Sequence, residues 1–187
     1  MKPAEAFRAL LIAAALLAAQ FECVRTSTVS GGGTDVSNAK VRGSVVHADG
    51  TPAVHARVAI IAASYDALRD GAIADSLIDT IDASGNYAFA KVDSGAYNVQ
   101  ALSSYDNTSA LAVGIHVVGD SVEIPEDTLR APGAIKVMLP DNLDAVNGYV
   151  YVPGTMISAR LNGSASYVLL DSVPAGKIQP VYYSAIN

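Results

Sequence analysis

From Lys40 onward, the chain consists of short runs of alternating apolar residues separated by Gly, Pro, Asn and Asp. A period of two places every second side chain on one face of an extended strand, and the separating residues favour tight turns. Asp49-Gly50 and Ser84-Gly85-Asn86 tolerate positive φ and predict hairpins. This pattern predicts an all-β chain folded as a β-sandwich. The expected strands cover residues 41–46, 57–62, 76–81, 87–90, 96–102, 110–118, 134–139, 149–152, 157–161, 167–170 and 178–183.

The composition agrees with a folded body and excludes one class of function. Hydrophobic residues make up 51% of the 187 residues and charged residues 16%, which is too apolar for a disordered chain. The length allows one or two domains. The net charge of −6 gives no attraction for a phosphate backbone, so nucleic acid is not an expected partner.

The N-terminus has the organisation of an export signal. A mildly basic stretch precedes residues 9–19, an uncharged apolar run. At 1.5 Å per residue this run is too short to cross a hydrocarbon core of about 30 Å, but it suits the apolar region of a secretory signal. We therefore expect residues 1–22 to be a signal peptide and residues 23–39, which contain Gly31-Gly32-Gly33, to be a flexible tether.

The single cysteine, Cys23, lies just after this segment. The arrangement resembles a bacterial lipoprotein, in which the signal is cut before a Cys whose thiol carries a diacylglyceryl lipid. The resemblance implies lipidation of Cys23, a membrane as partner, and a location in the cell envelope. The preceding residues, Gln20-Phe21-Glu22, depart from the small residue that the family prefers before its Cys, so ordinary cleavage after Ala19 is the competing expectation.

A weak internal repeat connects the two halves of the body. The first copy contains Asn86-Tyr87-Ala88-Phe89 followed by a Val and by Gly95, and the second contains Ser166-Tyr167-Val168-Leu169 followed by a Val and by Gly176. The two glycines lie one residue further apart than the two tyrosines. We expect two related modules, one over residues 40–130 and a partial one over residues 133–187.

The first copy resembles the carboxypeptidase regulatory-like family, a prealbumin-type, Ig-like β-sandwich. The matching residues are Val41-Arg-Gly-Ser-Val45, Gly50-Thr-Pro52, Ala56-Arg-Val58-Ala-Ile60, Gly85-Asn-Tyr87-Ala-Phe89, Val92 and Gly95-Ala-Tyr97-Asn-Val99. The second copy matches over fewer positions. The resemblance implies an accessory module without catalytic residues of its own, found beside peptidases, outer-membrane receptors and surface proteins.

The second copy ends about one strand after its Gly176 turn. An unpaired sheet edge there invites association or signals a missing partner strand, as in a truncated or split reading frame.

The sequence carries no motif that points to an enzyme or a cofactor. His47, His55 and His116 belong to no zinc-binding pattern, although a hairpin that brings His47 and His55 together with Asp49 would offer a surface metal site. Solvated turn residues are the simpler interpretation. The C-terminal Tyr-Arg-Gly-Ser of a hydrolase on the prealbumin fold is missing, so we expect no enzyme activity.

Four tyrosines form the candidate ligand platform. Tyr149 and Tyr151 lie two positions apart and face the same side of their expected strand, and Tyr182 or Tyr183 would lie near them. Such a platform would stack on sugar rings, whereas ordinary packing is the alternative. The acidic stretch 120–127 is expected to be a connector between modules rather than a calcium site. We therefore expect a non-catalytic envelope module for display, spacing or protein contact, with an unknown protein or a polysaccharide as partner and a carbohydrate-binding accessory protein as the alternative.

Overall fold

The computed structural model describes residues 40–119, 121–140, 147–161 and 166–186, all of which belong to one compact unit. The expected signal peptide (1–22), the expected tether (23–39) and Cys23 lie outside the described residues. The prediction of an all-β fold is confirmed: within the described ranges the regular elements are strands and one 3₁₀ turn, Asp75–Leu77.

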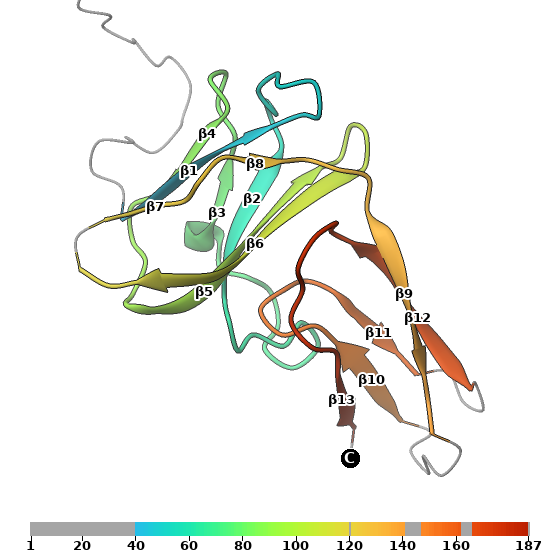
Figure 1. Ribbon diagram of the computed structural model, residues 1–187. Coiled ribbons are helices and arrows are strands. Elements are labelled where there is room, and N and C mark those ends of the chain that lie inside the picture. Colours follow the sequence, from blue (N-terminus) through green and yellow to red (C-terminus); the bar gives the residue numbers. More distant parts are fainter. Residues whose placement is uncertain (1–39, 120, 141–146, 162–165, 187) are drawn as a thin grey trace, which may run out of the picture. The chain divides into compact units, whose positions relative to one another are not determined.

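The N-terminal part (residues 40–130) contains two sheets (Figure 1). One sheet has the order β4-β1-β7, with β8 also pairing with β1, and the other has the order β3-β2-β5-β6. The strands are β1 (Val41–Val46), β2 (Arg57–Ala62), β3 (Ile78–Thr80), β4 (Asn86–Phe89), β5 (Gly95–Ser103), β6 (Thr108–Val117), β7 (Val122–Glu123) and β8 (Asp127–Thr128).

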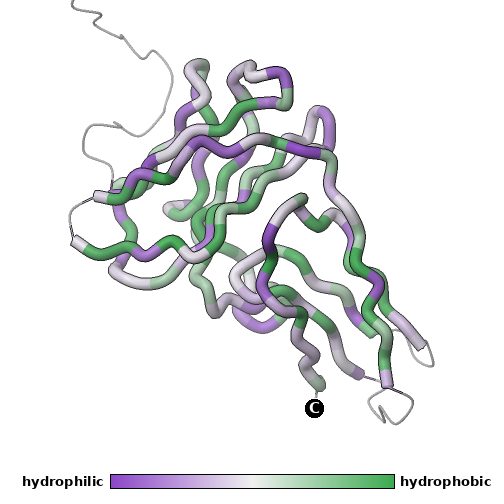
Figure 2. Tube along the Cα trace, viewed as in Figure 1, coloured by the Kyte–Doolittle hydropathy of each residue, from purple (hydrophilic) through white to green (hydrophobic). Residues whose placement is uncertain are grey.

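The core of this part is built from the alternate apolar residues of both sheets, and Figure 2 shows hydrophobic and hydrophilic stretches alternating along the strands. Burial of each large side chain contributes about 1.5–3 kcal/mol. Tyr87 on β4 lies opposite Gly43 on β1, where a Cβ would come within 2.4 Å of the Tyr87 hydroxyl. The larger core members are Val41, Val45, Val58, Ile60, Ile81, Tyr87, Phe89, Val92, Val99, Val117, Ile124 and Leu129.

The acidic stretch 120–127 is not the connector that the sequence suggested. β7 and β8 pair with β1 in parallel, with Val41 opposite Val122 and Val45 opposite Asp127. Ile124 and Leu129 are buried in the core. These strands were missed because each has only two residues, which is too short for a hydrophobic period to appear.

The C-terminal part (residues 133–186) has a two-stranded sheet, β12-β9, and a three-stranded sheet, β11-β10-β13 (Figure 1). A second core lies between them and contains Val150, Val152, Ile157, Leu170 and Val173. The strands are β9 (Gly133–Met138), β10 (Gly148–Tyr151), β11 (Ser158–Arg160), β12 (Tyr167–Val173) and β13 (Tyr182–Ala185).

Residues 63–74 form turns, in which the Asp66 carboxylate accepts the main-chain N–H groups of Leu68 and Arg69. The last strand begins at Tyr182 rather than at residue 178, since Pro180 has no N–H to donate to a sheet.

Candidate functional site

Three of the four predicted platform residues come together on one face of the β11-β10-β13 sheet. Tyr151 on β10 lies opposite Tyr182 on β13, and Tyr149 lies opposite Ser184. Alternation along β10 places Tyr149 on the same face as Tyr151. The ring centroids are 5.6 Å apart for Tyr149 and Tyr151 and 6.1 Å apart for Tyr151 and Tyr182. We name Tyr149, Tyr151 and Tyr182 the tyrosine cluster.

Tyr183 does not belong to this cluster. It lies opposite Val150, whose side chain is buried in the second core, and therefore projects from the other face of the sheet. Its ring lies over Gly148, where a Cβ would come within 2.7 Å of the Tyr183 ring. A period-two argument places Tyr182 and Tyr183 on opposite faces, but the residue opposite Tyr151 depends on the register.

The members of the tyrosine cluster differ in exposure. Tyr149 is buried, with 6% of its surface exposed, and its hydroxyl donates a hydrogen bond to Asp66 Oδ2 at 2.6 Å. This hydrogen bond to a carboxylate is the main cause that raises the pKa of Tyr149. Tyr182 is 51% exposed and Tyr151 is half-buried. A ligand at this face would therefore meet Tyr182 and part of Tyr151, while Tyr149 serves as their support.

The loop after β2 supplies charge beside the tyrosine cluster. Asp66 is buried, and its main-chain N–H donates to Asp70 Oδ2 at 2.8 Å. Arg69 Nε lies 2.8 Å from Asp70 Oδ1, and this hydrogen bond raises the pKa of Arg69 and lowers that of Asp70. Tyr151 also contributes to the raised pKa of Arg69, which agrees with a position of Tyr151 near this loop.

A second set of buried polar contacts lies where the turn between β10 and β11 meets β5. Asn98 is fully buried; its Nδ2 donates to the Gly154 carbonyl at 3.0 Å, and its Oδ1 accepts the Gly114 N–H at 3.1 Å. Gln100 Oε1 accepts the Met156 N–H at 3.1 Å. We name this set, together with the Tyr149–Asp66 hydrogen bond, the polar joint.

The geometry around Gly154 requires a glycine. Its φ is +67°, and a Cβ would lie 2.4 Å from Asn98 Nδ2 and 3.0 Å from Ala63 Cα. Its N–H donates to the Tyr65 carbonyl at 2.9 Å. The sequence offered no signal for the polar joint, because Asn98 and Gln100 read as the solvent-facing residues of a half-buried strand. They lie opposite Ile61 and Ala59 on β2, on the face away from the first core.

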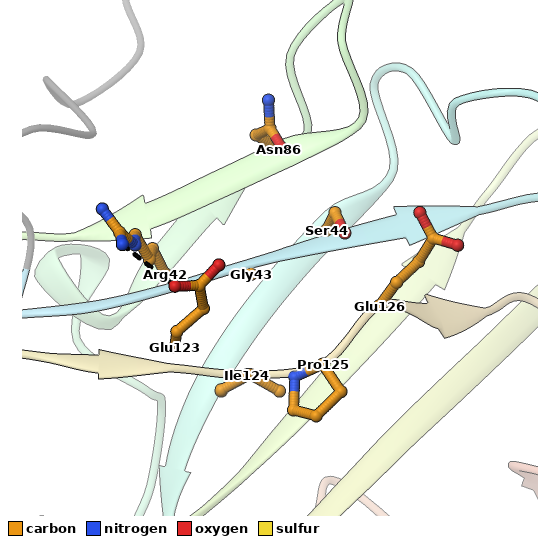
Figure 3. Close-up of a pocket in the computed structure, with 8 residues that line it drawn as sticks. All are labelled: Arg42, Gly43, Ser44, Asn86, Glu123, Ile124, Pro125 and Glu126. Atoms are coloured by element: carbon orange, nitrogen blue, oxygen red, sulfur yellow. Dashed lines mark hydrogen bonds and ion pairs between the residues drawn. The ribbon is translucent and has the colours of Figure 1, made fainter.

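A shallow groove of about 260 Å³ runs along β1, β4 and the β7–β8 segment (Figure 3). Arg42 Nη2 forms an ion pair with Glu123 Oε2 at 2.9 Å inside it. Both side chains are largely exposed, so solvent screens their interaction. The groove is lined by Arg42, Gly43, Ser44, Asn86, Glu123, Ile124, Pro125 and Glu126.

The histidines do not form the surface metal site that a hairpin could have created. His47 Nδ1 lies 3.5 Å from Asp106 Oδ2, whereas Asp49 accepts hydrogen bonds from Thr51. In the described ranges, no three or more His, Cys, Asp or Glu residues gather in a way that could hold a metal ion. No helix within these ranges combines the length and the apolar character needed to cross a membrane.

Comparison of the chain with protein-family models, with curated proteins and with solved structures found no match.

Proposed function

We propose that this chain is a non-catalytic cell-envelope protein that acts as a spacer and a protein-contact module. In this proposal, two related β-sandwich modules of the carboxypeptidase regulatory-like, prealbumin type follow an N-terminal signal and a tether. The observation that carries the spacer function is the polar joint, in which buried groups of residues 40–130 are bonded to groups of residues 133–186.

The strand pairing supports the relation between the modules. β4 pairs with β1 as β12 pairs with β9, and the order β3-β2-β5 has its counterpart in β11-β10-β13. Five consecutive strands therefore pair in the same way in both parts. The repeated Tyr residues lie on corresponding strands, Tyr87 on β4 and Tyr167 on β12, but on opposite faces, because Tyr87 is 3% exposed and Tyr167 is 47% exposed. Gly95 begins β5, whereas Gly176 precedes the first residue of β13, Tyr182, by a longer loop. The relation between the modules therefore rests on the strand pairing and not on the repeated residues.

The polar joint supports a rigid spacer rather than two modules that move freely. Asn98 and Gln100 are buried, and their side-chain amides form hydrogen bonds within the protein instead of with water. A buried amide that lost its partner would destabilise the fold by about 1–3 kcal/mol. Separation of the two parts would also expose the Tyr149–Asp66 pair to water. Both costs oppose hinge motion between β5 and the β10–β11 turn.

Backbone amide NMR relaxation tests this spacer function. We expect residues 40–130 and residues 147–186 to report one rotational correlation time in the wild-type chain. The Asn98→Ala variant should separate the two values while both parts keep their dispersed spectra. Two different correlation times in the wild type would overturn the spacer proposal.

The envelope location rests on the N-terminal sequence. An apolar run, a Cys and a Gly-rich tether follow one another over residues 9–33, as expected for a lipid-anchored protein. Palmitate labelling in a bacterial host should mark the wild type and spare Cys23→Ser. If the wild type takes up no label but is exported, cleavage after Ala19 replaces the anchor, and the spacer proposal stands without it.

Carbohydrate binding is the second candidate, and the exposed tyrosines favour it. Tyr151 and Tyr182 lie side by side on one sheet face, with the Arg69–Asp70 pair nearby. Affinity electrophoresis on soluble polysaccharides should retard the wild type, and Tyr182→Ala should restore free mobility. Tyr105→Ala is the matched control, because Tyr105 is 98% exposed and belongs to the turn between β5 and β6. Unchanged wild-type mobility would end this candidate, and metal-dependent peptidase turnover by the purified chain would contradict a non-catalytic role.

A further inference from the structure

The last strand, β13, lies at the outer edge of its sheet. It pairs with β10 on one side, and the described residues supply no strand on its other side (Figure 1). The N–H of Ile186 donates to the carbonyl of Asn147. Main-chain groups alternate in direction along an antiparallel ladder, so Tyr182 and Ser184 also point towards β10. The N–H and carbonyl groups of Tyr183 and Ala185 therefore point outwards.

The corresponding edge of the N-terminal part is covered. There β5 pairs with β2 on one side and with β6 on the other, and β6 runs antiparallel to β5. β13 holds the place of β5 in the C-terminal part but has only the β10 neighbour among the described residues. An antiparallel strand is thus the kind of neighbour that this edge is built to accept.

The β13 edge also lacks the features by which proteins prevent an exposed edge strand from pairing with another strand. Proteins protect such edges with charged side chains, prolines or bulges. Residues 181–186 contain neither a charge nor a proline, and Tyr182, Tyr183 and Ile186 are all exposed. Their exposed fractions are 51%, 39% and 41%, so three large hydrophobic side chains at or next to this edge remain in contact with water.

We propose that β13 pairs with β13 of a second copy of this chain, antiparallel and about a two-fold axis at Ser184. The proposal deepens the protein-contact function by naming the partner, but it depends neither on the anchor nor on the rigidity of the spacer. In this register Tyr183 lies opposite Ala185 of the partner subunit, and both present outward main-chain groups. Four main-chain hydrogen bonds, two from each such pair, would join the two sheets.

The side chains fit this self-pairing. Tyr183 meets the small Ala185 of the partner subunit on one face, and Tyr182 meets Ile186 of the partner subunit on the other. Each contact occurs twice by symmetry and removes exposed apolar surface from water. The two-fold axis places Ser184 opposite its own copy and brings like segments together, so charges near the axis would repel their counterparts. The uncharged stretch from Ile178 to Ile186 meets this condition.

Sedimentation velocity on the purified full chain tests the proposal. We expect a dimer whose population rises with protein concentration. Ala185→Pro should yield monomers, because it removes an outward N–H while the Ser184 and Ile186 bonds to β10 stay in place. Folding of this variant is checked by its near-UV circular dichroism. Met138→Pro, at the end of the exposed edge strand β9, is a control for a proline on another edge and should stay dimeric.

Charge substitutions at the axis give a test that does not depend on proline. Ser184→Lys alone and Ser184→Glu alone should each be monomeric, since like charges would face each other. An equimolar mixture should restore the dimer. A wild type that stays monomeric at every concentration overturns the proposal, and so does a dimer that survives both Ala185→Pro and Ser184→Lys.

Hydrogen exchange identifies any other occupant of the edge. The amides of Tyr183 and Ala185 should exchange fast in dilute protein and slowly in concentrated protein. Protection of these amides in the monomer would mean that another segment of the same chain covers the edge, which also overturns pairing with a second copy.

Discussion

The hydroxyl of Tyr149 donates a 2.6 Å hydrogen bond to Asp66 Oδ2 across 83 residues of sequence. Asp66 is 1% exposed and Tyr149 is 6% exposed, so neither group can turn to water if the other is lost. This contact connects the loop after β2 with β10, the middle strand of the β11-β10-β13 sheet. It supports the tyrosine cluster and forms part of the polar joint.

Removal of the Tyr149 hydroxyl should destabilise the chain. Tyr149→Phe leaves the Asp66 carboxylate with its two main-chain donors but without its side-chain donor. We expect a loss of about 1–3 kcal/mol in the free energy of unfolding, measured by urea titration. Tyr182→Phe is the control and should change the value by less than about 0.5 kcal/mol, because Tyr182 is half exposed.

The same contact should respond to alkaline pH. The hydrogen bond to Asp66 raises the pKa of Tyr149 in the folded chain above the ordinary value of about 10. Its contribution is thus fully present below pH 10 or so and is lost as pH rises through the folded pKa. The stability difference between wild type and Tyr149→Phe should be constant from about pH 7 to 9 and shrink above that. A difference that grows with pH would contradict this assignment.

Substitutions at Gly154 and Gly50 distinguish the energetic cost of backbone strain from the cost of a crowded Cβ. Both have positive φ, +67° and +81°, but a Cβ on Gly50 would meet nothing within 4 Å. Gly50→Ala should therefore cost about 1–2 kcal/mol for the left-handed conformation alone. Gly154→Ala should cost about 1–3 kcal/mol more, since the Cβ would collide with Asn98 Nδ2. Equal losses in thermal or urea unfolding would show that the β10–β11 turn does not pack on β5.

Substitution of Leu129 tests whether the acidic stretch and the residues just after it pack in the first core. Its side chain is 1% exposed, and its N–H donates to the Val46 carbonyl at 2.8 Å. Leu129→Ala should lower the free energy of unfolding by about 2–5 kcal/mol. Leu68→Ala, at a side chain 36% exposed in the loop after β2, should cost less than about 1 kcal/mol. A small loss at Leu129 would restore the connector interpretation.

Much of the local structure was predictable from local sequence patterns. β1 and β2 occupy the residues expected, Val41–Val46 and Arg57–Ala62, because short runs that contain Val and Ile lie there between segments rich in turn residues. A period of two correctly placed Tyr149 and Tyr151 on one face. The two-residue strands β7 and β8 are too short to show this pattern, and β13 begins four residues later than expected because Pro180 has no main-chain N–H to donate to a sheet.

The candidate site was predictable only in part. The sequence indicated a tyrosine platform but not which of Tyr182 and Tyr183 joins it, since that choice depends on the register between β10 and β13. It gave no reason to connect Asp66 with Tyr149 or Asn98 with Gly154. Cross-strand partners and loop contacts come from the packing of distant segments, which no local pattern records.

By itself, the sequence determined the all-β class and the face of most strands, because side-chain direction in an extended strand follows from the position along the chain. Tertiary structure decided which faces are covered. Asn98 and Gln100 follow the pattern of solvent-facing residues, yet they are buried because the β10–β11 turn packs on β5. The reason is physical: alternation is a property of neighbours in sequence, whereas burial and hydrogen-bond partners depend on segments 56 or 83 residues away.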